Sequence, residues 1–275
     1  MSDTSLDSLA SGIRSGTRYT VLIDDTGSPG AKNTPGNLHP ARKSWVAVIL
    51  SPQESFEVST QLPLALDELE RATGATEFHF TEIYSGKGPF KNLPLDLRLG
   101  LFGFMAEIFS IYKFPILVQT LDPDNAMFQQ FRSTFEKNPP PVAFKVNKHE
   151  DVALFFLLCR VKWFLREKGV TAADAAYVVV DEGFRDAGAS LRLPSFSSVF
   201  HNGNVSFAAS NQLSHLQLAD FAAFSLNREQ WLLGKDTLSP LDETLATILS
   251  KIAWNYVNIG RVTYDQWWNP KGSPN

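Results

Sequence analysis

The sequence predicts one α/β domain in which helices cover a mixed β-sheet. Short β-branched runs alternate with longer segments whose apolar residues recur at helical spacing, a pattern typical of strands and helices that build one domain. Neither an internal repeat nor a clear linker divides the 275 residues. Because 44% of the residues are hydrophobic and 20% are charged, the chain has material for a sizeable core, and wholesale disorder is excluded.

The first half of the chain is expected to supply three strands and two helices. Apolar runs bounded by turn residues predict strands at residues 19–23, 45–50 and 115–121. The short connection between the first two favours an antiparallel pair. Leucine spacing predicts a helix at residues 63–72, which Gly74 would end, and a second helix at residues 95–112.

The second half is expected to supply two strands and three helices. The longest helix is predicted at residues 148–168, and a buried strand at residues 175–180 follows it. A short strand at residues 205–209 precedes two further helices, at residues 214–231 and 241–257. The resulting alternation supports a mixed sheet with helices packed against it.

The domain is expected to span residues 18–257. Residues 1–17 are small and polar, which indicates a flexible leader without a secretory signal, and residues 258–275 form a tail. The longest apolar stretch, residues 152–159, is far shorter than the ~20 residues that cross a membrane. The single cysteine, Cys159, excludes an internal disulfide framework and reads as a core residue. We therefore expect a cytoplasmic protein with no membrane partner.

Acidic residues stand at the ends of two predicted strands and inside one predicted helix. Asp24 and Asp25 follow the first strand, Asp181 follows the strand at 175–180, and Asp220 interrupts an apolar helix. Ligand sites in open α/β sheets lie beyond the carboxyl ends of the strands, and clustered carboxylates suit Mg²⁺ or Mn²⁺. Asp and Gly are also common in simple turns, which is the alternative interpretation of the strand-end acids.

Two short motifs resemble those of a known family. Ile23-Asp24-Asp25-Thr26-Gly27-Ser28 resembles the aspartate, glutamate, serine, glycine motif of the domain of unknown function 3800 family. Residues 216–222, Leu-Gln-Leu-Ala-Asp-Phe-Ala, resemble the family's later glutamine, apolar, alanine, aspartate motif, and Asp181 is the expected strand-end aspartate between the two. The resemblance spans roughly residues 18–232. Here Asp25 replaces the family's usual glutamate, and its shorter side chain reaches less far.

The resemblance implies a ribonuclease H-like fold and a site for two divalent ions. Carried over by position, Asp24 would bridge the ions, Asp181 and Asp220 would each hold one, and Glu82 or Glu77 would be the fourth acid. Asp25 is a further candidate metal ligand. The implied reaction is phosphodiester hydrolysis with Mg²⁺ or Mn²⁺.

Further residues are candidates for substrate contact. His79 could contact phosphate or assist proton transfer, although its alternation with aromatic residues is more typical of packing at a sheet edge. Lys87, in a Gly-rich loop that lacks the full P-loop pattern, could reach a phosphate. Gln217 lies one turn before Asp220, where it could contact substrate or pair with that carboxylate.

The expected function is that of a metal-dependent nuclease acting on DNA or RNA. A net charge of −4 does not fit binding by bulk positive charge, but it leaves room for a local basic groove. Lysines and arginines outnumber acidic residues between 142 and 170, which usually marks a solvated helix face and less often a nucleic-acid contact. The alternative function is a ribonuclease H-like binding or interaction module without catalysis.

Overall fold

A mixed six-stranded sheet with helices on both faces forms the centre of the protein. The computed structural model describes residues 6–27, 38–137 and 144–257. The strands lie in the order β3-β2-β1-β4-β6-β5. Their bounds are β1 Thr20–Thr26, β2 Lys43–Leu50, β3 Ile116–Leu121, β4 Tyr177–Asp181, β5 Ser190–Arg192 and β6 Asn204–Ala208. β1, β2 and β3 form an antiparallel meander, β4 and β6 extend the sheet in parallel from β1, and β5 is antiparallel to β6.

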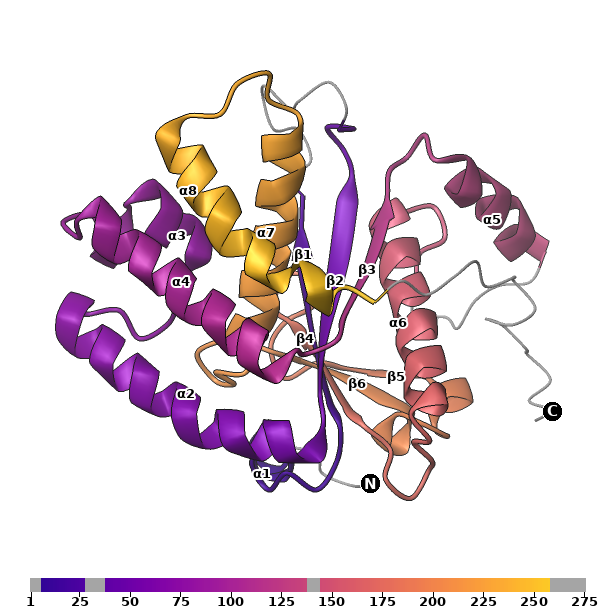
Figure 1. Cartoon of the computed structure of the whole chain (residues 1–275). Coiled ribbons are helices and arrows are strands. Elements are labelled where there is room, and N and C mark those ends of the chain that lie inside the picture. Colours follow the sequence, from indigo (N-terminus) through magenta and orange to yellow (C-terminus); the bar gives the residue numbers. More distant parts are fainter. Residues whose placement is uncertain (1–5, 28–37, 138–143, 258–275) are drawn as a thin grey trace.

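The helices form two layers (Figure 1). α2, α4, α7 and α8 cover one face of the sheet, whereas α6 covers the other with α5 beside it. Their bounds are α2 Pro52–Thr73, α3 Phe80–Ser85, α4 Leu95–Tyr112, α5 Ala126–Lys137, α6 His149–Glu167, α7 Leu216–Leu233 and α8 Pro240–Leu249. A 3₁₀ segment, Ser250–Asn255, continues α8. The expected α/β architecture is therefore confirmed.

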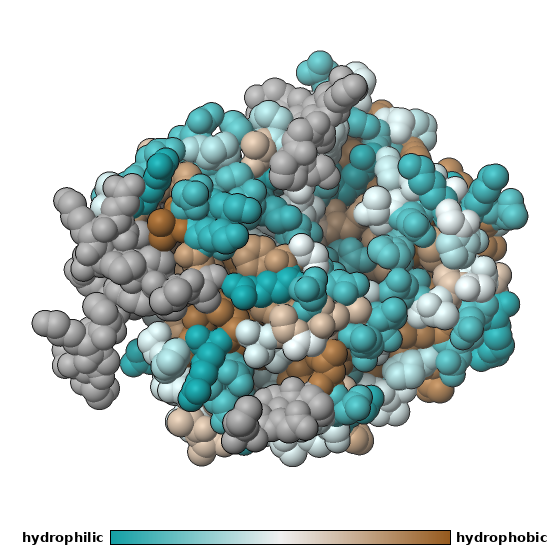
Figure 2. Space-filling view, turned by 180° about the vertical axis from the view of Figure 1, so that it is seen from behind, coloured by the Kyte–Doolittle hydropathy of each residue, from teal (hydrophilic) through white to brown (hydrophobic). Residues whose placement is uncertain are grey.

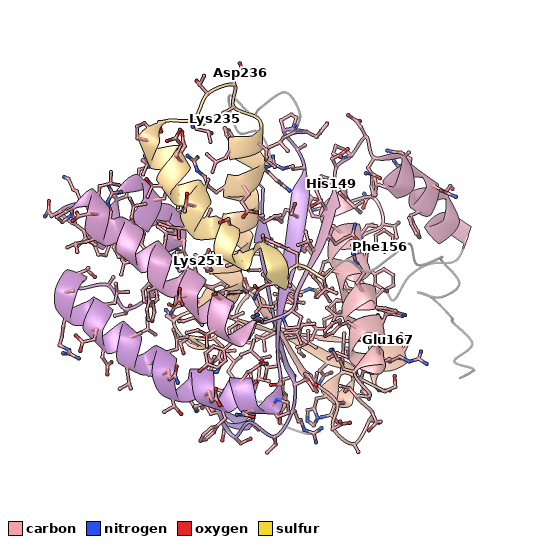
Figure 3. The ribbon with its side chains drawn as sticks, in the orientation of Figure 1. His149, Phe156, Glu167, Lys235, Asp236 and Lys251 are labelled. Atoms are coloured by element: carbon pink, nitrogen blue, oxygen red, sulfur yellow. The ribbon has the colours of Figure 1, made fainter. Side chains whose placement is uncertain are left out.

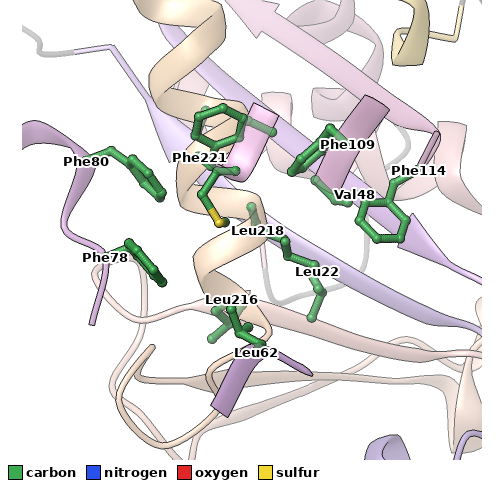
Figure 4. Packing of buried hydrophobic residues seen from close by; sticks show 14 of the residues in the cluster. Leu22, Val48, Leu62, Phe78, Phe80, Phe109, Phe114, Leu216, Leu218 and Phe221 are labelled. Atoms are coloured by element: carbon green, nitrogen blue, oxygen red, sulfur yellow. The ribbon is translucent and has the colours of Figure 1, made fainter. Parts of the chain in front are cut away.

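Each face of the sheet has its own hydrophobic core. Along β1, Leu22 packs with the α7 layer, whereas Val21 and Ile23 pack with α6, because successive side chains of a strand point to opposite faces. Figure 4 shows Leu22 and Val48 of the sheet against Phe221 of α7, in a cluster rich in aromatic rings. This alternation decides which strand residues can meet α7.

Two segments differ from the sequence-based expectation. The leader is helical: α1, Leu6–Arg14, buries Leu9 and Ile13 and packs against α2, because its apolar residues recur at helical spacing. The segment at 77–83 is not an edge strand, since α3 begins at Phe80 with His79 as its N-cap. The proposed tail at 258–275 lies outside the described residues.

Both ends of α2 agree with its capping residues. Gly74 ends α2 in the left-handed conformation, with φ 77°. Ser51 opens the same helix with a capping box that includes Glu54, so α2 begins well before the expected residue 63.

None of the described helices is long and apolar enough to cross a membrane. One face of the molecule, seen from behind in Figure 2, is largely hydrophilic with scattered apolar side chains.

Candidate functional site

Asp24 and Asp181 lie side by side on neighbouring strands. β1 and β4 are parallel and in register through Ile23 and Val180, so the next residues of both strands are the two aspartates. Adjacent strands are about 4.8 Å apart. The alternation that points Leu22 and Val179 toward the α7 layer also points Asp24 and Asp181 there.

Asp220 approaches the two strand aspartates from above the sheet. Its helix, α7, packs on β1 and β4, and its neighbours Ala219 and Phe221 are buried. The charge of Asp220 raises the pKa of Asp24 and of Asp181, which shows that the three carboxylates lie within electrostatic range of one another. The structure thus brings together one residue from each of β1, β4 and α7.

Burial is the main cause of the pKa shifts in this cluster. It raises the pKa of Asp24 well above the ordinary value, and the charges of Asp220 and Asp181 raise it further. The pKa of Asp181 rises to about 7, through burial and the charge of Asp220, and that of Asp220 rises to about 6, mainly through burial. Counted over the whole residue, all three aspartates are half-buried. A cation at this site would lower all three pKa values.

The three carboxylates are neighbours but not a ready set of ligands. Among the described residues, no three His, Cys, Asp or Glu side chains are arranged so that they could hold one ion. Carboxylates of like charge repel one another, which opposes their close approach in the absence of a cation. Asp181 Oδ1 is buried without a hydrogen-bond partner, as expected of an oxygen that is free to bind a cation.

Asp25 lies on the other face of the sheet. Its cross-strand partner is Trp45, which packs with the α6 layer, and its carboxylate forms an ion pair with Lys43. Only its backbone reaches the cluster, where the Asp25 N–H donates to Asp24 Oδ1 at 2.7 Å. The alternation of β1 therefore separates the Asp25 side chain from the three aspartates, although its charge still raises the pKa of Asp24.

Of the two candidate glutamates, Glu77 lies beside Asp220. Its charge raises the pKa of Asp220, and its carboxylate accepts a 2.5 Å hydrogen bond from Ser210 Oγ. Glu82 instead lies against Gly88, where an added Cβ would be 2.6 Å from Glu82 Oε2. Ser210 had no sequence signal, because it meets Glu77 only through tertiary packing.

His79 and Gln217 lie at the same end of the cluster. The exposed His79 has Nε2 3.5 Å from Glu77 Oε1, and its charge lowers the pKa of Asp220. Gln217 is buried, and its amide oxygen accepts a hydrogen bond from the Phe78 N–H at 2.9 Å. Gln217 thus fixes the segment that carries Glu77 and His79 to α7, and its amide oxygen binds this backbone rather than pairing with Asp220.

Two other predicted positions lie elsewhere. Lys87 is exposed just before a short 3₁₀ turn, and its backbone N–H donates to the carbonyl of Glu82. His215, directly before α7, is buried at 2% exposure, and its Nε2 lies 3.0 Å from Ser59 Oγ of α2. Cys159 is buried in α6, as expected.

We expect the apo protein to lose stability as pH rises from 5 to 8. Because the folded-state pKa of Asp181 is about 7, the folded chain holds more protons than the unfolded chain between about pH 4 and 7, and stability falls with pH there. Thermal melting in EDTA should show a Tm several degrees lower at pH 8 than at pH 5.

The variant Asp181→Asn isolates this contribution. It should flatten the pH dependence and raise the Tm at pH 8, whereas Asp67→Asn, on the exposed face of α2, should leave both unchanged. Burial also raises the pKa of Glu229 to about 7, so Glu229 contributes to the same pH dependence. Comparing Asp181→Asn with the wild type separates the contribution of Asp181 from that of Glu229. An identical pH profile for wild type and Asp181→Asn would contradict the electrostatic description of the cluster.

No family model, curated protein or solved structure matches the chain.

Proposed function

We propose that the protein is a metal-dependent nuclease that hydrolyses phosphodiester bonds in DNA or RNA. The observation that carries the proposal is the convergence of Asp24, Asp181 and Asp220 at one end of the sheet. Carboxylates whose pKa is raised by burial and by neighbouring negative charge are unfavourable alone and become favourable beside a divalent cation. These positions are also the ones that the resemblance to the domain of unknown function 3800 family, and to ribonuclease H-like proteins, implies.

The donor set suits Mg²⁺ or Mn²⁺. These hard cations prefer carboxylate oxygens, and the described part of the cluster offers no thiolate that would select a softer metal. Asp24 has Asp181 on the neighbouring strand, and the charge of Asp220 acts on it as well, which supports Asp24 as our candidate for a ligand shared by both ions. The bound ions would activate water and stabilise the leaving oxygen.

The remaining polar residues supply positioning and proton exchange. Gln217 holds the segment that contains His79 against α7. His79 is exposed beside Asp220 and Glu77, where it can exchange a proton between solvent and the reacting oxygens. Lys87 is an exposed cation in the following loop and remains our candidate for a phosphate contact away from the reacting bond.

The competing function is a binding module without catalysis. It is favoured by the arrangement of the acidic side chains, since no three of them among the described residues are positioned to hold one metal ion. A cleavage assay on single- and double-stranded DNA and RNA, with Mg²⁺ or Mn²⁺ and with EDTA, separates the two. The nuclease proposal predicts cleavage that EDTA stops, whereas wild-type protein that cleaves none of these substrates would support the binding module.

A further inference from the structure

A second concave site opens on the face of the sheet opposite the three aspartates. It is a pocket of ≈ 440 Å³ between the end of β1, the start of β2, the segment that leads into α6 and the loop after β4. This volume lies in the range of pockets that hold small organic groups. Because Asp25 lines it and Asp24 belongs to the aspartate cluster, consecutive residues of β1 connect the two sites.

Cations dominate the accessible part of this pocket. Lys145 and Lys148 are exposed on its rim, and Arg185 contributes a guanidinium from the loop after β4. Two of the acidic residues in its wall are already bound: Asp25 pairs with Lys43, and the buried Asp151 accepts a 2.8 Å hydrogen bond from the Lys145 N–H. Glu150 is the third acid of the lining, so four cationic side chains stand against three acidic ones and the pocket keeps a small excess of positive charge.

An aromatic ring stands beside these cations. Phe184 is half-buried and meets Trp45 edge to face, with ring centroids 5.5 Å apart and planes at 89°. The guanidinium of Arg185 lies 5.8 Å from the centre of the Phe184 ring. An aromatic surface next to lysines is the combination that single-stranded nucleic acids recognise, through base stacking and phosphate contacts.

We propose that this pocket binds one nucleotide unit of the strand whose neighbouring phosphate reaches the aspartate cluster. Lys145 and Lys148 contact its phosphate, and its base packs against Phe184. The proposal rests on the proposed nuclease function, and it narrows the substrate to a nucleic acid with a single-stranded stretch that can bend around the carboxyl end of β1. Free nucleotides carry the same groups as a nucleotide unit of a strand, namely a planar base linked through a sugar to a phosphate.

The test is binding of fluorescent single-stranded DNA and RNA of about twelve nucleotides, measured by anisotropy in EDTA so that cleavage does not interfere. We expect Lys145→Ala/Lys148→Ala to weaken binding at least tenfold and to reduce the salt slope by about 0.7, the contribution of the one phosphate that both lysines contact on a single strand. Phe184→Ala should weaken binding roughly fivefold or more while leaving the salt slope unchanged.

A charge-matched control is Lys168→Ala/Lys251→Ala. Lys168 follows Glu167 at the far end of α6 from His149, and Lys251 lies in the other helical layer (Figure 3). Both lysines are exposed and outside the pocket lining, so this variant should bind like wild type. Circular dichroism and melting curves check that every variant is folded.

The outcomes separate this proposal from the nuclease proposal. Wild-type binding that the pocket variants leave unchanged would overturn the pocket and leave the nuclease intact, and absence of wild-type binding to either oligonucleotide would also overturn the pocket. Pocket-dependent binding by a protein that cleaves nothing would instead overturn the nuclease alone. A free 5′-mononucleotide that competes as strongly as the oligonucleotide would contradict the claim that the ligand belongs to a strand.

Discussion

Asp24→Asn is expected to abolish nuclease activity, with a loss of at least about a thousandfold in turnover. The charges of Asp181 and Asp220 both act on Asp24. A neutral amide at this position would weaken every ion held there, whereas contacts to substrate phosphates would remain. Substrate affinity should therefore survive better than turnover, and cleavage of labelled DNA and RNA with Mg²⁺ or Mn²⁺ measures the loss.

The control for this variant is Asp67→Asn, which removes the same charge from an exposed position on α2. It should cleave at the wild-type rate. Activity that persists both in Asp24→Asn and in EDTA would belong to another site or to a contaminating enzyme. Equal activities of Asp24→Asn and Asp67→Asn in the presence of metal would contradict the role assigned to Asp24.

Mn²⁺ should raise the Tm of the wild-type protein by roughly 5–10 °C at a hundredfold excess over its dissociation constant. Such an excess corresponds to about 2.7 kcal/mol of linked stabilisation, and one kcal/mol shifts the Tm of a protein of this size by about 2–4 °C. Differential scanning calorimetry at pH 8 measures the shift. The increase should be largest at high pH, where the carboxylates are ionised.

In the variant Asp220→Asn, the Tm should depend little on Mn²⁺. Because the substitution relieves the repulsion among the three carboxylates, its apo Tm at pH 8 should match or exceed that of the wild type, and Mn²⁺ should raise it little. A large loss of Tm without metal would show instead that Asp220 is needed for the hydrogen bond that it accepts from the Phe80 N–H. That result would make Asp220 a structural residue.

The sequence was sufficient to predict the elements that carry the aspartates. The β-branched run before Asp24, the buried strand before Asp181 and the apolar helix around Asp220 all formed close to the expected bounds. Local pattern determines such elements strongly, because burial on one or both faces imposes a period of two or of 3.6 residues. The strand β5, with three residues, was too short to give a pattern.

Features that depend on tertiary packing could not be predicted in the same way. The sequence placed Asp25 with Asp24, but β1 extends through Thr26, and alternation sends their side chains to opposite faces. Glu77 reaches Asp220 because Gln217 binds the Phe78 backbone, a contact between residues 139 positions apart. Residues 6–14 of the expected leader form α1, whose apolar side packs against the adjacent helix α2.

The most direct test of the central claim is the anomalous difference density of a crystal soaked in Mn²⁺. The proposed function predicts at least one peak among Asp24, Asp181 and Asp220, with carboxylate oxygens from these residues at roughly 2.0–2.3 Å from manganese, in the range typical of hard divalent ions. The same soak of Asp24→Asn crystals should lose that peak. A wild-type crystal with no peak among these residues, or with manganese held only elsewhere, would contradict the metal centre.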